Sequence, residues 1–229
     1  MVAYLFCGDS RLRCPQPQRK LWLGAPVLWT QLPRDPSPRR LRRVGRRIGR
    51  LGARRVILSE ELPAGVGGWL GLPGVDPLPL CRAKGAELAL TLLGDVPPRL
   101  RRVALVGEDA REGAAIALAL CPQVGVLMLD FDREEGPLRQ ALWARYGAVC
   151  LSPGQAPPPQ VTVELSRREG LSEGRVLGLW GEPDLGGLTL ALDRPLPPDA
   201  PVLPVLELLW ETGRVELEQI GIRPAARLT

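Results

Sequence analysis

The sequence predicts an α/β protein with an open parallel sheet and helices on both faces, followed by a smaller β-rich or mixed C-terminal lobe. Between residues 101 and 151, apolar runs of four to six residues alternate with helix-forming stretches. Such β-α-β crossovers imply parallel strands with right-handed connections. Beyond residue 160, short apolar runs are separated by Gly and Pro, which favours a different lobe there. With 229 residues, 45% of them hydrophobic, the chain is long enough to bury a sizeable core.

Residues 1–94 contain the expected strands 2–7, 27–32 and 54–58 and the expected helices 38–51 and 80–93. Ser37 is placed as a helix N-cap, with Pro38 at the favoured first helical position. Leu41, Val44, Ile48 and Leu51 then follow at helical spacing and form one apolar stripe. The Gly- and Pro-rich stretch 63–79 is expected to be a long loop anchored by Trp69.

The clearest pattern lies further along the chain. Strands are expected at 103–106, 124–129 and 148–151, and helices at 110–120 and 137–146. This order is Rossmann-like. We therefore expect a Rossmann-like domain over residues 1–151, with two halves at 1–94 and 95–151. A Pro-rich connector at 152–160 and a C-terminal lobe at 161–229 would complete the chain.

The amino-acid composition excludes several kinds of catalytic and metal site. The sequence has no histidine, which excludes histidine-dependent catalysis and histidine metal ligands. No CxxC pair occurs among the five cysteines, so neither a disulfide framework nor a zinc site is indicated. No complete catalytic motif is found, and whether the protein is an enzyme stays open. No apolar run approaches the roughly 20 residues that span a bilayer, and no signal peptide is recognised, so a cytoplasmic protein is expected.

Acidic residues follow three of the expected strands. They are Glu60 with Glu61, Glu108 with Asp109, and Asp130 with Asp132. In an open parallel sheet, ligands bind beyond the carboxyl ends of the strands. Converging carboxylates there would bind sugar hydroxyls or Mg²⁺, and the metal ligands would then be Asp109, Asp130 and Asp132. The structural alternative is that Asp109 and Asp132 cap the helices that follow them.

Gly107 follows one of these strands and opens a helix, and Asp130 lies about 20 residues further on, where a ribose-binding acid falls in dinucleotide sites. The layout resembles that of Rossmann dehydrogenases. Asp109 and Glu112 stand where the fingerprint requires glycine, so the classical NAD or FAD motif is absent.

The segment Asp130-Phe131-Asp132 resembles the first motif of haloacid-dehalogenase phosphatases. Glu134 replaces the threonine of that motif, and the only lysines, Lys20 and Lys84, lie upstream of it. The same segment is similar to the DxD segment of Toprim domains, for which Glu108 would supply the additional glutamate. Either resemblance implies carboxylate- and Mg²⁺-dependent phosphotransfer.

Charge is distributed unevenly. Residues 1–55 carry fourteen basic and two acidic residues, whereas the remainder of the chain carries a net charge of −7. On the helix 38–51, four arginines lie opposite the apolar stripe: Arg39, Arg43, Arg46 and Arg50. This face would contact the phosphates of nucleic acid or a lipid surface, or it would be solvated or paired with the acidic remainder. No aromatic residue is interleaved with the arginines, so base stacking is not indicated.

The sequence favours a regulatory or accessory protein that binds a small molecule or nucleotide near Glu60, Gly107, Glu108, Asp109, Asp130 and Asp132. Mg²⁺ or a nucleotide is the expected cofactor class. Two alternatives stay open: a nucleic-acid-associated protein that uses the basic helix, and a carboxylate- and Mg²⁺-dependent phosphotransfer enzyme. Self-association also stays open.

Overall fold

A computed structural model describes residues 1–8, 16–63, 65–167, 173–196 and 199–225. Contacts divide the chain into two compact units. Unit 1 comprises residues 1–77 and 190–221, and unit 2 comprises residues 78–189 and 222–229. Within the described residues, no helix is both long and apolar enough to cross a membrane.

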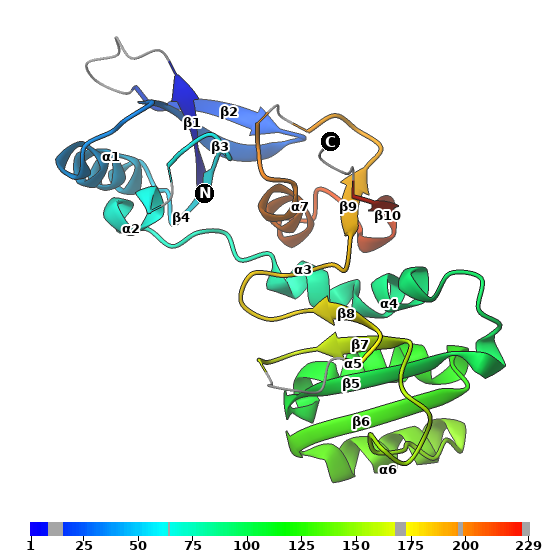
Figure 1. Cartoon of the computed structure of the whole chain (residues 1–229). Coiled ribbons are helices and arrows are strands. Elements are labelled where there is room, and N and C mark those ends of the chain that lie inside the picture. The colour runs from blue at the N-terminus through cyan, green and yellow to red at the C-terminus, as the bar shows by residue number, and fades with distance from the viewer. Residues whose placement is uncertain (9–15, 64, 168–172, 197–198, 226–229) are drawn as a thin grey trace. The chain divides into compact units, whose positions relative to one another are not determined.

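Unit 1 is built on a four-stranded sheet with the order β2-β3-β1-β4 (Figure 1). Its strands are β1 (Val2–Gly8), β2 (Gln18–Trp22), β3 (Ala25–Pro33) and β4 (Arg55–Leu58). The strands β3 and β4 both pair in parallel with β1, while β2 pairs antiparallel with β3. Leu23 and Gly24 form the tight turn between β2 and β3, both with positive φ, as a two-residue hairpin turn requires.

Helix α1 (Pro38–Arg50) joins β3 to β4. Pro38 occupies its first turn as expected, but the N-cap Ser37 makes no capping hydrogen bond with its side chain. Of the expected apolar stripe, Leu41, Val44 and Ile48 pack into one core cluster with sheet residues such as Leu5. The fourth expected member, Leu51, is the C-cap of the helix and is 39% exposed, so it does not belong to the stripe. Because this stripe is sealed against the sheet, the opposite face of α1 must be exposed.

The stretch 63–79 was expected to be a loop, and the structure corrects this expectation. It contains a short helix, α2 (Val66–Leu70), whose Val66 and Leu70 are buried in the same core cluster as the stripe of α1. The buried apolar residues of α2 are four positions apart and cover one turn of helix. Tertiary burial therefore stabilises a helix that a Gly-rich sequence disfavours.

The C-terminal part of the chain is β-rich and mixed. The strands β9 (Leu188–Leu192) and β10 (Ile220–Pro224) form a two-stranded sheet. Helix α7 (Val202–Glu211) and the short 3-10 helix η3 (Leu217–Gln219) lie between them in sequence. Within unit 1, Arg55 of β4 forms an ion pair of 2.6 Å with Glu211 of α7.

Unit 2 contains the expected parallel sheet. Its strands are β5 (Arg102–Asp109), β6 (Val126–Arg133), β7 (Val161–Glu164) and β8 (Arg175–Gly178), in the order β6-β5-β7-β8. All three pairings are parallel, which confirms the side-by-side arrangement expected for β5 and β6.

Two segments of unit 2 differ from expectation. Residues 148–151 were expected to form a third strand, but they contribute only one parallel bridge, between Leu151 and Met128. Leu151 therefore lies beside β6, whereas β7, which was expected in the C-terminal lobe, pairs with the other side of β5. Periodicity predicts that an apolar run forms a strand but not which strand it pairs with.

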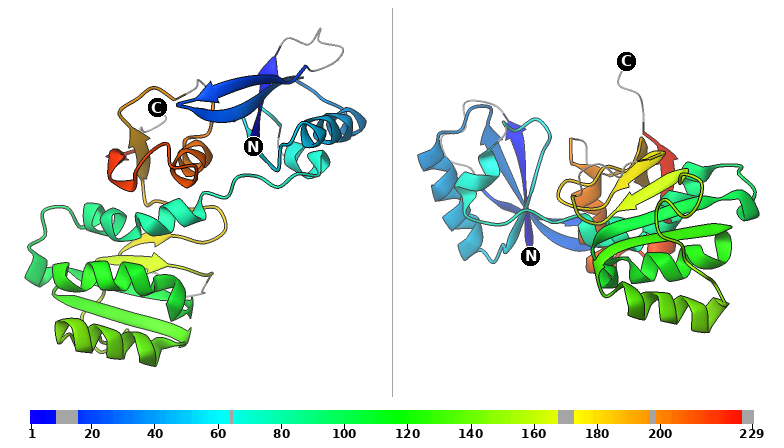
Figure 2. Two further views of the ribbon diagram at one scale, coloured as in Figure 1. Left: turned by 180° about the vertical axis from the view of Figure 1, so that it is seen from behind. Right: turned by 60° about the horizontal axis from the view of Figure 1, so that its bottom comes forward.

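The helices of unit 2 flank this sheet (Figure 2). They are α3 (Leu78–Ala83), α4 (Gly85–Leu93), α5 (Ala110–Leu120) and α6 (Glu135–Tyr146), with the short 3-10 helices η1 (Pro98–Leu100) and η2 (Cys121–Gln123). Helix α5 approaches the sheet closely, since a Cβ at Gly113 would lie 2.8 Å from Leu165 and 2.9 Å from Phe131. On the face that carries Ala104 and Met128, the described cover includes Leu151 and Ala156.

Candidate functional site

The acidic residues expected to converge belong to two different sheets. Glu60 is exposed and follows β4 in the sheet of unit 1. Glu108 and Asp109 end β5, and Asp130 and Asp132 lie on β6, in the sheet of unit 2. Since β4 is not a neighbour of β5 or β6, the expectation that three adjacent strands gather these acids is corrected.

At the end of β5, two of the predicted ligand-binding residues have structural roles. A Cβ at Gly107 would lie 3.2 Å from Leu165 and 3.3 Å from Phe131, so this glycine permits close packing. Asp109 is the N-cap of α5: its carboxylate accepts the Arg111 backbone N–H at 2.9 Å and the Arg111 guanidinium at 2.8 Å. These hydrogen bonds hold the pKa of Asp109 below its usual value.

The end of β6 is hydrogen-bonded to the first turn of α6. Glu135 accepts the backbone N–H of Phe131 at 2.7 Å and pairs with Arg139 at 2.7 Å. The N-cap of α6 is Glu134 and not Asp132, which is exposed. Across the described part of the chain, no group of three or more His, Cys, Asp or Glu residues is arranged to hold a metal ion. Ligand binding by Asp130 and Asp132 stays a prediction.

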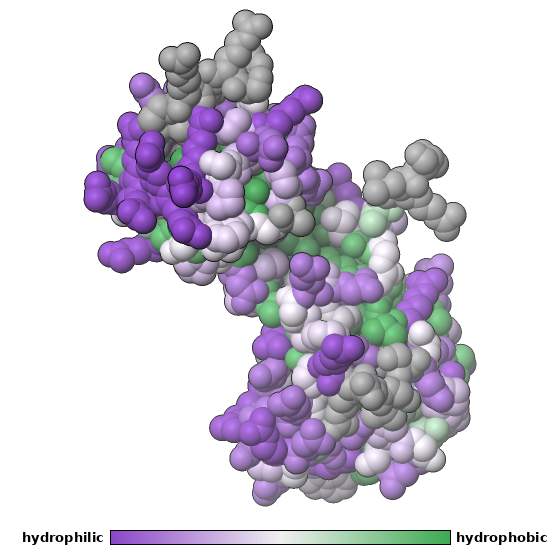
Figure 3. Space-filling model, turned by 60° about the vertical axis from the view of Figure 1, so that its left-hand side comes forward, coloured by the Kyte–Doolittle hydropathy of each residue, from purple (hydrophilic) through white to green (hydrophobic). Residues whose placement is uncertain are grey.

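Helix α1 exposes more arginines than the four that the sequence pattern placed opposite the apolar stripe. Six arginines of α1 are exposed, and we call this set the arginine surface: Arg39, Arg42, Arg43, Arg46, Arg47 and Arg50. Hydrophilic side chains dominate the face of unit 1 over this helix (Figure 3). The four-residue spacing produces two rows, and successive guanidinium groups in a row are about 6 Å apart along the helix axis.

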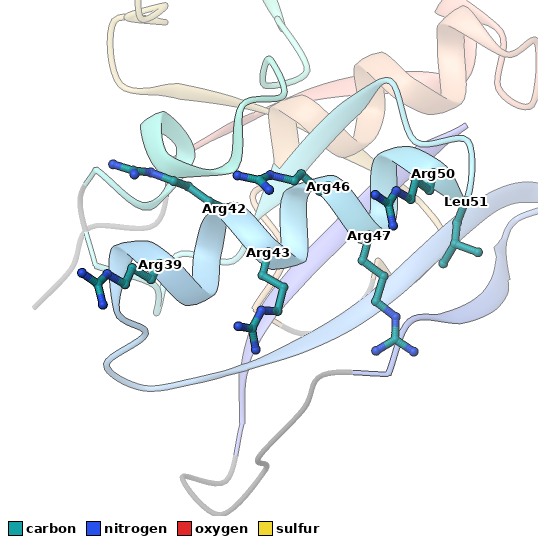
Figure 4. Close-up of a pocket in the computed structure, with 7 residues that line it drawn as sticks. All are labelled: Arg39, Arg42, Arg43, Arg46, Arg47, Arg50 and Leu51. Carbon is teal, nitrogen blue, oxygen red and sulfur yellow. The ribbon is translucent and has the colours of Figure 1, made fainter.

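An open groove of about 720 Å³ runs along the arginine surface (Figure 4). All six arginines line it, and the partly exposed Leu51 closes one end. In the close-up, Arg43 and Arg47 extend to one side of the helix, whereas Arg42 and Arg46 extend to the other. The groove is therefore lined almost entirely by hydrogen-bond donors that carry permanent positive charge.

Four of these six arginines form no ion pair among the described residues. Helix α1 contains no acidic residue. Among the described residues, no ion pair joins Arg39, Arg43, Arg46 or Arg50 to a carboxylate, which disfavours pairing with the acidic remainder of the chain. Like charges at four-residue spacing destabilise a helix slightly, so the repulsion must be offset by burial of the apolar stripe. An anion bound in the groove would relieve that repulsion.

One residue at this surface was not predicted from the sequence. Trp69 of α2 is 43% exposed, and the guanidinium carbon of Arg42 lies 4.8 Å from its ring centroid. An aromatic residue does therefore adjoin the arginines, although it is 27 positions away from Arg42 in the sequence. The only signal was a tryptophan inside a Gly-rich stretch, which we interpreted as the anchor of a loop.

No family model and no curated protein matches the sequence. Among solved structures, the chain is similar to L-tryptophan dehydrogenase from Nostoc punctiforme, with 13% sequence identity and a TM-score of 0.31. The matched region covers 62% of this chain and 44% of the dehydrogenase. Because both the identity and the score are low, no functional residue is transferred from that protein.

Proposed function

We propose that this protein binds nucleic acid through the arginine surface of helix α1, with the guanidinium groups contacting backbone phosphates. The observation that carries the proposal is the alignment of six exposed arginines along one groove, in a helix without any acidic residue. Phosphate contacts from Arg and Lys supply most of the affinity of sequence-independent nucleic-acid binding.

Arginine is well suited to this role. Its planar guanidinium donates paired hydrogen bonds to phosphate oxygens and stays charged at every physiological pH. Two rows of such groups match a linear array of phosphates better than a single small anion, which would engage only two or three of them.

The burial pattern favours nucleic acid over a lipid surface. Amphipathic helices that bind membranes insert an apolar face among the lipid chains. In α1 the apolar face is already buried in the core of unit 1, since Leu41 and Ile48 are at most 2% exposed and pack against the sheet. Only electrostatic attraction remains at the exposed face, and nucleic acid offers the higher density of negative charge.

The test is fluorescence anisotropy with a labelled oligonucleotide at several salt concentrations. Four to six phosphate contacts predict a slope of log K against log salt of about −3 to −5, since each contact contributes about 0.7 to 0.9. The double variant Arg43→Ala/Arg46→Ala should weaken binding and reduce the magnitude of the slope by about 1.4 to 1.8.

A matched control removes the same charge elsewhere. Arg99 and Arg194 are exposed and lie outside α1, so Arg99→Ala/Arg194→Ala should leave both affinity and slope nearly unchanged. Equal losses of affinity for the two double variants would show that binding depends only on the net charge of the protein. Absence of salt-dependent binding, or capture of anionic phosphatidylserine vesicles in preference to the oligonucleotide, would contradict the proposal.

A further inference from the structure

The position of Trp69 beside the arginine surface is set by close packing between α1 and α2. A Cβ at Gly45 would lie 1.9 Å from the carbonyl oxygen of Leu70, so only glycine allows the two helices to approach this closely. Leu70 itself is 4% exposed and is part of the core cluster of unit 1. The residue before it, Trp69, is consequently held at the margin of the groove instead of being free to turn away.

The indole of Trp69 is not one of the buried side chains of the core. Its 43% exposure contrasts with that of Trp22 in the same unit, which is 5% exposed and belongs to an aromatic cluster. Large aromatic side chains are usually well covered in folded proteins. An exposed tryptophan that contacts the arginine surface, through Arg42 at 4.8 Å, is an arrangement suited to a planar ligand.

We infer that the arginine surface takes single-stranded nucleic acid, with an unpaired base stacked against Trp69 while the adjoining phosphates lie along the arginines. This inference rests on the proposed function. Proteins that bind single strands combine a positively charged groove with aromatic rings on which bases stack. In a duplex the base faces are already stacked on one another, so a ring at the rim of a phosphate groove has nothing to contact. The indole thus adds affinity for unpaired bases only.

The experiment compares three probes of equal length: oligo(dT), the same backbone with abasic sites, and a duplex. The abasic strand retains the phosphates but offers no base. Trp69→Ala should weaken oligo(dT) binding by about 5- to 150-fold, the range expected for loss of one base–aromatic stack. Its affinity for the abasic strand and the duplex should be unchanged, and Trp69→Phe should retain part of the lost affinity because the ring persists.

The chain offers a matched control. Trp143 of α6 is 59% exposed and lies in unit 2, so Trp143→Ala should bind all three probes as the unaltered protein does. If Trp69→Ala binds oligo(dT) normally while Arg43→Ala/Arg46→Ala does not, stacking is wrong and the proposed function stands. Equal weakening of all three probes by Trp69→Ala would also overturn stacking, because a charge or folding defect would explain it. If no probe binds the unaltered protein, both proposals fail.

Discussion

Replacing Gly45 by alanine tests how α1 and α2 are held together. The added Cβ would lie 1.9 Å from the Leu70 carbonyl oxygen, and a Cβ essentially never lies closer than 3.0 Å to a non-bonded heavy atom, so α2 must recede by at least about 1 Å. The obstacle is backbone and cannot rotate away. Overpacking of this kind costs about 1 to 3 kcal/mol.

Gly49 provides the matched comparison because it lies one turn further along α1 and its added Cβ would meet nothing within 4 Å. Both substitutions gain about 1 kcal/mol of helix propensity. That gain cancels in the difference between the two variants, so the difference isolates the packing clash. We expect Gly49→Ala to stabilise unit 1 by about 1 kcal/mol and Gly45→Ala to be about 1 to 3 kcal/mol less stable than Gly49→Ala.

The assay is urea unfolding followed by tryptophan fluorescence. To report on unit 1 alone, Trp143 and Trp180 of unit 2 are replaced by phenylalanine in every variant, which leaves only the tryptophans of unit 1 as reporters. Equal stabilisation by Gly45→Ala and Gly49→Ala would refute the reasoning. It would show that α2 does not press on α1 at Gly45 and that the position of Trp69 is not set by this contact.

Three further predictions concern other parts of the chain. Ile48→Ala should destabilise unit 1 by about 2 to 5 kcal/mol in the same assay, because the side chain is fully buried beneath the arginine surface; a loss below 1 kcal/mol would contradict the packing of α1 on the sheet. The pKa of Asp109 is lowered by Arg111, so the contribution of Asp109 to the free energy of unfolding should be complete above about pH 4 and decline as the pH falls through the native pKa. The difference in the free energy of unfolding between the unaltered protein and Asp109→Asn should therefore shrink at low pH. A difference that does not depend on pH would count against the hydrogen-bonded cap. Burial raises the pKa of Cys150 to about 11, so its thiol should resist alkylation at pH 8 until urea is added, whereas the partly exposed Cys7 should react before Cys150 in a mass-spectrometric time course; early labelling of Cys150 would show that its site opens readily.

The elements with strong local signals were predictable. Helix α1 follows from Pro38 and from the repeat of Leu41, Val44 and Ile48, and the structure places it at 38–50. The parallel pairing of β5 with β6 follows from the helix between them, because a β-α-β crossover leaves few other arrangements. These features depend on residues close together in the sequence, so periodicity and turn residues suffice to predict them.

Long-range pairing was not predictable to the same degree. The sequence did not show that β7, 10 residues beyond Leu151, pairs with β5, nor that residues 148–151 add only a single bridge to β6. It also did not show that β4, which precedes Glu60, belongs to a different sheet from β5 and β6. Local pattern identifies a strand but does not name its partner.

For the candidate site, the sequence by itself determined the charge. Seven arginines fall within one helix whose apolar stripe must be buried, so a cationic exposed face is unavoidable. Only the tertiary structure decided that Arg39, Arg43, Arg46 and Arg50 have no described carboxylate partner and that Trp69 adjoins them. The physical reason is that helix periodicity depends on residues close together in the sequence. The contact between α1 and α2 instead depends on the absence of a Cβ at Gly45 and on the carbonyl oxygen of Leu70, 25 residues away.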